Sequence, residues 1–481
     1  MAANVRLLSR YSGPFLIALC AAFLIAQVLV RPAVGLANNG DFSKMAGPFG
    51  LGPEDGSWET REEFAEFIYR FTKADRFNYN GRFATAEFLS SEFFLMKAAR
   101  GLQRLFHPGP RFDIRWLGGV GAALFLFAIG IWIYALPSRW RIMAGLFVVF
   151  IWTDVAYVQY LNSFYMDTPA LIFLVMCVAA GLHFVKNRES RLFALIMVLA
   201  CILFATSKPQ QGVAALVFVP LFLAFACWSR DGVVRPLLIA GAVVSVGGAM
   251  LVMGRIGPDW GTRNVYNVVF MQIAPNSADP LRTLEDLGLG RDELPLVGTY
   301  AYMQNSPIQN PEWARAFSKR CTYGTLMRYY VLHPFATAHV VYQQLIVFGP
   351  QIRPWGNLAR EDGFTGRAQA SHFTYWSDLR SYLFKHAPWC VFVLAFAITL
   401  GALWLLFGTP EDRAFAALVL AVQLIAALEC ASAVLADGVE TERHLLLFHV
   451  TTDITILLIA PLMLRVWKQA RHQANRPAQT A

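Results

Sequence analysis

The run IRWLGGVGAALFLFAIGIWIYA, residues 114–135, is apolar almost throughout, and Arg115 near its start is its only charged residue. As an α-helix, about 20 apolar residues cross a hydrocarbon core that is about 30 Å thick. Nine more apolar stretches of about 15 to 23 residues follow or precede it, and nearly all are long enough to span a bilayer. The sequence therefore predicts an all-α polytopic membrane protein with about ten transmembrane helices.

Charged and turn-forming residues interrupt the apolar runs and set the limits of the predicted spans. The spans are Pro14–Val30, Ile114–Ala135, Ile142–Leu161, Thr168–Val185, Leu192–Thr206, Gly212–Trp228, Pro236–Met253, Ala387–Phe407, Ala414–Ala436 and Leu445–Leu464. Two long connections divide the chain into a tail with the first span (1–31), a first external loop (32–113), spans two to seven (114–253), a large external loop (254–386), spans eight to ten (387–466) and a tail (467–481).

The composition excludes a soluble fold, because 15% of residues are charged, against about 25% in soluble domains. The net charge of +9 does not indicate nucleic acid, because the basic residues cluster in alternate connections and in both tails. By the positive-inside rule these segments are cytoplasmic, so a multi-pass protein of the inner membrane with both termini inside is expected. We expect the first span to be a retained anchor, although a cleaved signal is the other interpretation.

Amphipathic segments are predicted in both long loops. In the first loop, Phe64, Ile68 and Phe71 recur near helical spacing and precede an aromatic-rich segment, which favours two helices along the membrane surface. The aromatic-rich segment contains Phe83, Phe88, Phe93, Phe94, Leu102 and Phe106. In the large loop, His333-Pro334 begins a further helix through Phe348, because proline suits a first helical turn.

Two acidic residues follow or precede spans on the external side. Asp41 lies in Asn38-Asn39-Gly40-Asp41-Phe42, whose Asn-Gly step favours a tight turn that displays the carboxylate. Asp167 lies in the short connection 162–169, where it suits a helix cap, a metal or an acceptor hydroxyl. We predict both as catalytic, and an ordinary polar turn is the other interpretation of Asp41.

External basic residues oppose the positive-inside trend, which makes Lys208 and Arg443 informative. Lys208 suits a lipid phosphate, although snorkelling of its side chain would also explain it. Arg443 lies in an external turn rich in charged residues, where a surface ion-pair cluster is the other interpretation. The predicted substrate-binding residues are Asn39, Lys208, Gln210 and Arg443.

Three ionisable residues lie within predicted spans. Exposure of Asp154, Glu429 or Asp453 to lipid would cost about 2.5 to 3.5 kcal/mol each, so we expect them to face the protein interior. Hydrogen bonding between helices explains them as well as a function does.

Together these motifs resemble the GT-C superfamily of membrane glycosyltransferases, which includes protein O-mannosyltransferases and lipid-A aminoarabinose transferases. The chain is most similar to bacterial glycan-biosynthesis hexose transferases with an Asn-Gly-Asp-Phe run after the first helix. The resemblance implies that Asp41 is the catalytic carboxylate, Asp167 the second acidic residue and Lys208 a phosphate contact. Glu54-Asp55 is the nearest match to a paired acidic dipeptide that some members carry in loop one.

The expected function is transfer of a sugar from a polyprenyl-phosphate donor to a glycan, lipid or protein acceptor at the external face. Short internal loops offer no room for a nucleotide site, so the donor has to arrive through the membrane. Mg²⁺ or Mn²⁺ is left open as a cofactor, with Asp41 and Asp167 as candidate ligands. One alternative is a lipid or solute transporter or flippase that uses the intramembrane acidic residues. Another is a glycan ligase or polymerase that depends on Arg263, Arg328 and Arg353.

Overall fold

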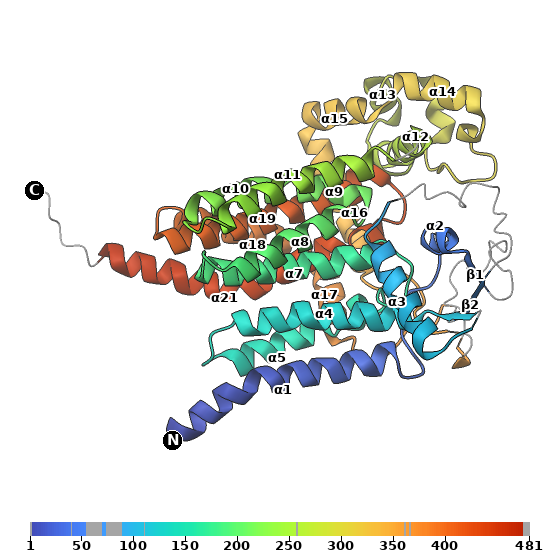
Figure 1. Cartoon of the computed structure of the whole chain (residues 1–481). Coiled ribbons are helices and arrows are strands. Elements are labelled where there is room, and N and C mark those ends of the chain that lie inside the picture. The colour runs from blue at the N-terminus through green and yellow to red at the C-terminus, as the bar shows by residue number, and fades with distance from the viewer. Residues whose placement is uncertain are drawn as a thin grey trace, which may run out of the picture.

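A computed structural model describes residues 2–39, 41–53, 70–73, 89–109, 111–255, 258–359, 362–364 and 367–474. Most of the described chain forms helices that run side by side in one bundle (Figure 1). The bundle helices are α1 (Ala2–Val28), α4 (Arg115–Ala135), α5 (Arg141–Trp152), α7 (Asp167–Lys186), α8 (Arg191–Ala205), α9 (Pro209–Ala215), α10 (Phe218–Trp228), α11 (Val234–Met253), α18 (Trp389–Leu405), α19 (Pro410–Ser432) and α21 (Leu446–Ala474).

All ten predicted spans contain helix, but not all are as long as predicted. Among the described residues, seven helices are long and apolar enough to cross a membrane, or eight if α18 is joined with α17 (Tyr375–His386). α5 and α8 have only 12 and 15 residues. The predicted third span is wrong beyond Trp152, because Asp154 adopts an extended conformation and its side chain caps the short α6 (Val155–Val158).

α7 lies at the centre of the bundle. Of its apolar window, 89% is buried, and it packs against α4, α8, α19 and α21. Gly181 permits the close approach of α19, because a Cβ there would lie 3.0 Å from Leu418. The first residue of α7 is Asp167, so the best-packed helix carries a predicted site residue at its end.

A buried polar network fixes a sharp bend between α17 and α18, which meet at 101°. Arg380 on α17 pairs with Asp453 on α21 at 2.6 Å, and the indole of Trp376 donates to the same carboxylate at 2.8 Å. Asp154 accepts from the backbone amides of Trp376 and Ser377 at 3.1 and 3.0 Å. Asp154 and Asp453 are thus buried, as predicted, and they attach α17 to the bundle.

The first external loop forms short elements at one end of the bundle, opposite the end where α1 begins and α21 ends (Figure 1). They are α2 (Phe42–Ala46), η1 (Gly47–Phe49), α3 (Glu92–Phe106) and an antiparallel sheet β1-β2-β3 (Leu51–Pro53, Arg70–Lys73 and Arg111–Asp113). α3 corresponds to the second predicted surface helix. Phe71 lies in a strand, so the first predicted surface helix does not reach it. The predicted residues outside the described part are Gly40, Glu54, Asp55, Phe64, Ile68, Phe83 and Phe88.

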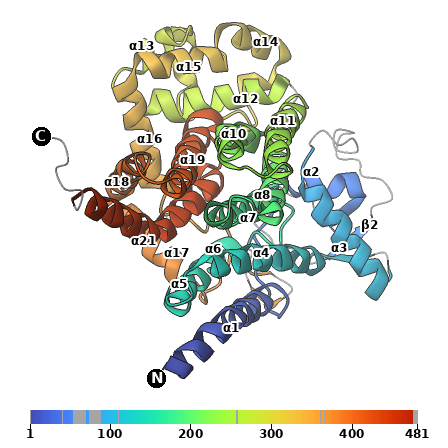
Figure 2. The same cartoon turned by 60° about the vertical axis from the view of Figure 1, so that its left-hand side comes forward.

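Residues 258–332 form a helical cap that stands apart from the bundle helices (Figure 2). It has its own apolar core around Tyr266, Phe270 and Phe317. Its elements are α12 (Pro258–Asn267), η4 (Val268–Ile273), η5 (Ala274–Asn276), α13 (Pro280–Asp286), η6 (Arg291–Leu296), η7 (Pro307–Gln309), α14 (Pro311–Arg320) and α15 (Tyr323–Leu332). The predicted helix α16 (Pro334–Phe348) follows, and η9 (Ala433–Asp437) and α20 (Thr441–His444) join α19 to α21.

Candidate active site

Asp41 is held in a turn built by the two asparagines before it. The amide of Asp41 donates to Asn39 Oδ1 at 3.1 Å, and the amide of Phe42 donates to Asn38 Oδ1 at 3.2 Å. Phe42 is buried and packs edge-on against the ring of Tyr165. The side chain of Asp41 remains 22% exposed, so the turn presents its carboxylate at the loop-bearing end of the bundle.

Arg443 joins three carboxylates, two of which come from distant parts of the chain. Its Nη2 lies 3.0 Å from Asp41 Oδ2, and its Nη1 lies 3.0 Å from Asp167 Oδ2. Nη2 also lies 2.6 Å from Glu440 Oε2. The Arg443 side chain is only 5% exposed, and a buried guanidinium requires such compensating charges and hydrogen bonds. This one side chain of α20 therefore connects the first external loop with the start of α7.

Lys208 extends the charge network on the other side of Asp167. Its Nζ lies 3.2 Å from Asp167 Oδ1 and 3.0 Å from His444 Nδ1. His444 Nε2 lies 3.0 Å from Asp437 Oδ2. If Nδ1 accepts from the ammonium group, Nε2 carries the hydrogen and donates to Asp437. Lys208 is buried among these partners, which differs from the position of a snorkelling side chain.

Lys44, one helical turn after Asp41, completes the network. Its Nζ lies 2.5 Å from Asp41 Oδ1 and 4.4 Å from the ring centre of Trp260 in the cap. Burial would raise the pKa of Asp41, but the positive charges of Lys44 and Arg443 outweigh burial and hold that pKa well below its usual range. Asp41 is therefore ionised at neutral pH, with both oxygens paired. Lys44 was not predicted from the sequence, although its i,i+3 spacing from Asp41 was a signal.

Two aromatic rings flank the guanidinium of Arg443. Its centre lies 4.9 Å from the ring centre of Tyr165 and 5.9 Å from that of Trp355. The hydroxyl of Tyr165 donates to the carbonyl of Ala37 at 2.7 Å and accepts from the amide of Asn39 at 3.0 Å. Rings in this position stabilise a cation over their faces. Trp355, like Trp260, comes from the large external loop and had no local sequence signal.

We call this charge network the Arg443 cluster. Five of the six predicted site residues meet in it: Asn39, Asp41, Asp167, Lys208 and Arg443. Asn39 takes part because its Nδ2 donates to Glu440 Oε1 at 2.5 Å. Gln210 does not take part, since it is half-buried on α9 and has no hydrogen bond or ion pair within the described residues. The next residue, Gln211, points inward instead and hydrogen-bonds Glu429.

Asp167 is not a helix cap, because Met166 is the N-cap residue of α7 and makes no side-chain cap bond. Its two oxygens bind Lys208 and Arg443 instead. Among the described residues, by contrast, the arginines of the large loop share no partner. Arg263 lies over the ring of Tyr302 and Arg353 pairs with Asp378 at 2.5 Å, while Arg328 is exposed on α15.

The residues of the cluster do not fit a metal ion. Within the described part of the chain, no group of three or more His, Cys, Asp or Glu side chains is arranged to hold one. The two candidate ligands, Asp41 and Asp167, both face the guanidinium of Arg443. A cationic side chain thus lies where the sequence left open a Mg²⁺ or Mn²⁺ ion.

Residues 3–479 match the family described as the YfdI N-terminal transmembrane domain. The chain belongs to this family. YfdI is a GT-C-like glycosyltransferase, and the helical bundle is consistent with that fold class. The predicted superfamily is thereby confirmed. No curated protein sequence matches it.

Among solved structures, the chain is similar to the archaeal oligosaccharyltransferase AglB from Archaeoglobus fulgidus in complex with an inhibitory peptide and a dolichol-phosphate. The TM-score is 0.41 and the identity 11%, over 98% of this chain and 53% of that one. The apo form of the Archaeoglobus fulgidus oligosaccharyltransferase gives a TM-score of 0.40 and 11% identity, over 98% and 53%. The chain thus spans about half the length of these structures.

Proposed function

We propose that this chain transfers a sugar from a polyprenyl-phosphate donor to a glycan, lipid or protein acceptor at the external face of the inner membrane. The observation that carries the proposal is the Arg443 cluster, in which Asp41 and Asp167 share one guanidinium and Lys208 adjoins Asp167. A partly exposed carboxylate can accept a proton from a substrate hydroxyl, and buried cations beside it can stabilise negative charge on a leaving group.

The opposite end of the bundle supports a donor that is carried by a lipid. There, α4–α5, α7–α8 and α10–α11 are joined by the connections 136–140, 187–190 and 229–233. Connections of about five residues are too short to form a nucleotide-binding site. A lipid carrier would instead present the sugar phosphate at the loop-bearing end, with its tail among the bundle helices.

In the proposed reaction, an acceptor hydroxyl attacks the anomeric carbon of the donor sugar, and the bond from that carbon to the phosphate oxygen breaks. The bonding electrons leave with the lipid phosphate, whose charge Lys208 and Arg443 stabilise. Asp41 accepts the proton of the acceptor hydroxyl and later releases it to solvent. The products are the glycosylated acceptor and polyprenyl phosphate.

The ion pairs of Asp41 imply an order of binding. Both carboxylate oxygens are paired, and a carboxylate with a lowered pKa is a weak base. A donor phosphate near Lys208 competes with Asp41 for Arg443, because it is an anion with several acceptor oxygens. Loss of that partner raises the pKa of Asp41 and frees one oxygen for the acceptor hydroxyl. The donor would therefore bind before the acceptor is activated.

The experiment that tests the proposal compares Asp41→Asn with Asp113→Asn in membrane vesicles supplied with a radiolabelled polyprenyl-phosphate sugar. Both aspartates lie in the first external loop, pair with an arginine and are similarly exposed, at 22% and 26%. Asp41→Asn should lower turnover by about 10² to 10⁴-fold because it removes the base. Asp113→Asn should stay within about two-fold of wild type, since its ion pair is partly exposed.

Size-exclusion chromatography of both variants in detergent would verify that they fold. Near-normal transfer by Asp41→Asn would show that the aspartate is not the base. If Arg353→Ala abolished transfer at the same time, the glycan ligase or polymerase mechanism would replace the one proposed here.

A further inference from the structure

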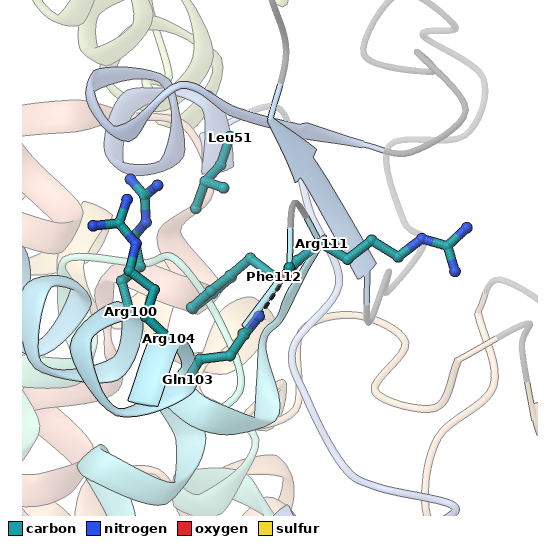
Figure 3. Close-up of a pocket in the computed structure, with 7 residues that line it drawn as sticks. Leu51, Arg100, Gln103, Arg104, Arg111 and Phe112 are labelled. Atoms are coloured by element: carbon teal, nitrogen blue, oxygen red, sulfur yellow. Dashed lines mark hydrogen bonds between the residues drawn. The ribbon is translucent and has the colours of Figure 1, made fainter. Parts of the chain in front are cut away.

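A small hollow in the first external loop lies beside two arginines that the proposed reaction does not use. Arg100 and Arg104 border it from α3, while Leu51, Gln103 and Phe112 line its other sides (Figure 3). Its volume is about 90 Å³, which is enough for a phosphate group, since one water occupies about 30 Å³ in the liquid. Arg111 contributes to the lining, but its guanidinium points away from the hollow in Figure 3.

The positive charges of Arg100 and Arg104 are not compensated by any carboxylate in the described part of the chain. Arg100 Nη1 donates to the carbonyl of Phe49 at 2.8 Å, which leaves its other N–H groups for a ligand. Burial and the neighbouring charge of Arg104 lower the pKa of Arg100. Like charges one helical turn apart destabilise each other, so an anion in the hollow would relieve their repulsion.

α3 carries an exposed apolar stripe beside these arginines. Phe94, Leu102 and Leu105 are 62%, 41% and 73% exposed and recur at helical spacing. The opposite face, with Leu95 and Met96, is buried against the rest of the chain. A helix with a lipid-facing apolar stripe and basic side chains along one edge is the pattern of a helix that lies in the membrane interface. Its arginines then lie at the depth of the lipid phosphates.

We propose that this hollow binds the phosphate of an anionic membrane lipid, whose acyl chains lie along the apolar stripe of α3. The site shares no side chain with the Arg443 cluster, and the segment from Asp41 to Leu51 connects the two. The adjacent apolar stripe favours a lipid over free phosphate, because a soluble anion would gain nothing from it.

The test measures binding to the full chain in detergent by native mass spectrometry, with phosphatidylglycerol, diacylglycerol and inorganic phosphate as separate probes. The double variant Arg100→Gln/Arg104→Gln should weaken phosphatidylglycerol binding by about ten-fold or more, because charge-assisted hydrogen bonds are lost. Arg104→Gln alone, at an exposed position that is tolerant of change, should weaken it by a smaller factor. Lys97→Gln is the matched control, since Lys97 is an exposed cation of α3 that does not line the hollow.

Binding of diacylglycerol should be weaker and should not change in the variants. An equal loss in Lys97→Gln and Arg104→Gln would overturn the proposal, because it would show attraction to general surface charge. Phosphatidylglycerol binding no tighter than that of diacylglycerol would also overturn it. If inorganic phosphate bound as tightly as the lipid, the hollow would be a site for free anions, and the lipid assignment would be wrong.

Discussion

Asp41 has one cation on each carboxylate oxygen, and Lys44 is the nearer of the two at 2.5 Å. Removing a neighbouring positive charge destabilises the carboxylate anion, so Lys44→Gln should raise the pKa of Asp41. If the ionised form of Asp41 is the base, the acid limb of the pH profile of kcat/KM should shift to higher pH. Lys97→Gln, which removes a cation outside the cluster, should leave the limb in place. An unshifted limb in Lys44→Gln would mean that another group controls activity at low pH.

Lys208 offers a second test, because its proposed partner is the donor phosphate. Lys208→Met should raise the KM for the donor by about 10 to 100-fold, which corresponds to a loss of about 1.5 to 3 kcal/mol for a charge-assisted hydrogen bond. Asp167 keeps its contact with Arg443 in this variant, which should allow folding. Lys319→Met, at an exposed position of the cap, is the control. An unchanged donor KM would assign Lys208 a structural role.

Local sequence chemistry predicted Asp41, Asp167 and Lys208 as site residues, because each lies in a short polar turn next to an apolar run. The sequence could not show that Arg443 connects Asp41 with Asp167, since the contact between Arg443 and Asp41 joins positions 402 residues apart along the chain. Gln210 lies outside the Arg443 cluster for a local reason. α9 starts at Pro209, and its helical phase turns the following glutamine, Gln211, toward the interior instead.

At the level of secondary structure, hydropathy predicted which segments are helical but not where each helix ends. The third span ends early because of Asp154, a single polar residue that starts a new helix. α17 has no apolar run of its own and depends on the buried pair of Arg380 and Asp453, which only the folded chain brings together. The strands of the first loop are three or four residues long, too short for a periodic signal.

α3 begins with a buried acidic residue that predicts a pH-dependent stability. Both oxygens of Glu92 lack a hydrogen-bond partner among the described residues, and burial raises its pKa well above 4.5. The folded protein therefore retains this proton over a pH range in which the unfolded chain loses it. The contribution of Glu92 to the free energy of unfolding is fully present below the pKa that this residue has in the unfolded chain. It decreases by about 1.4 kcal/mol per pH unit as the pH rises from there toward the pKa of Glu92 in the folded protein.

Glu92→Gln cannot titrate, so its free energy of unfolding should exceed that of wild type near pH 8, and the difference should shrink toward pH 5, by about 1.4 kcal/mol per unit. Thermal unfolding in detergent at several pH values would measure this. Glu312→Gln, at an exposed position of the cap, should show no such trend. A pH-independent difference would mean that Glu92 is ionised in the folded protein and has a cationic partner.

For the whole molecule, both described chain ends and the connections 136–140, 187–190 and 229–233 lie at one end of the bundle, and α2, α3 and the start of α7 lie at the other (Figure 1). Asp41 directly precedes α2 and Asp167 begins α7, so the Arg443 cluster lies at this second end. The orientation of this arrangement in the membrane is a prediction from the positive-inside rule. Cysteine labelling tests it, but not at the site itself. Asp167, Lys208 and Arg443 are 2%, 7% and 4% exposed, so cysteines there would react slowly from either side.

Exposed reporter positions avoid this difficulty. Lys319→Cys and Tyr302→Cys in the cap should react with a membrane-impermeant maleimide on intact cells, because both native side chains are exposed. Trp140→Cys and Arg230→Cys, in two short connections, should react only after permeabilisation. Cys227 is exposed and has to be replaced first, whereas Cys321 in the cap is buried and can stay. The reverse pattern would place Asp41 in the cytoplasm, where soluble sugar nucleotides are accessible, and a lipid-linked donor would no longer be required.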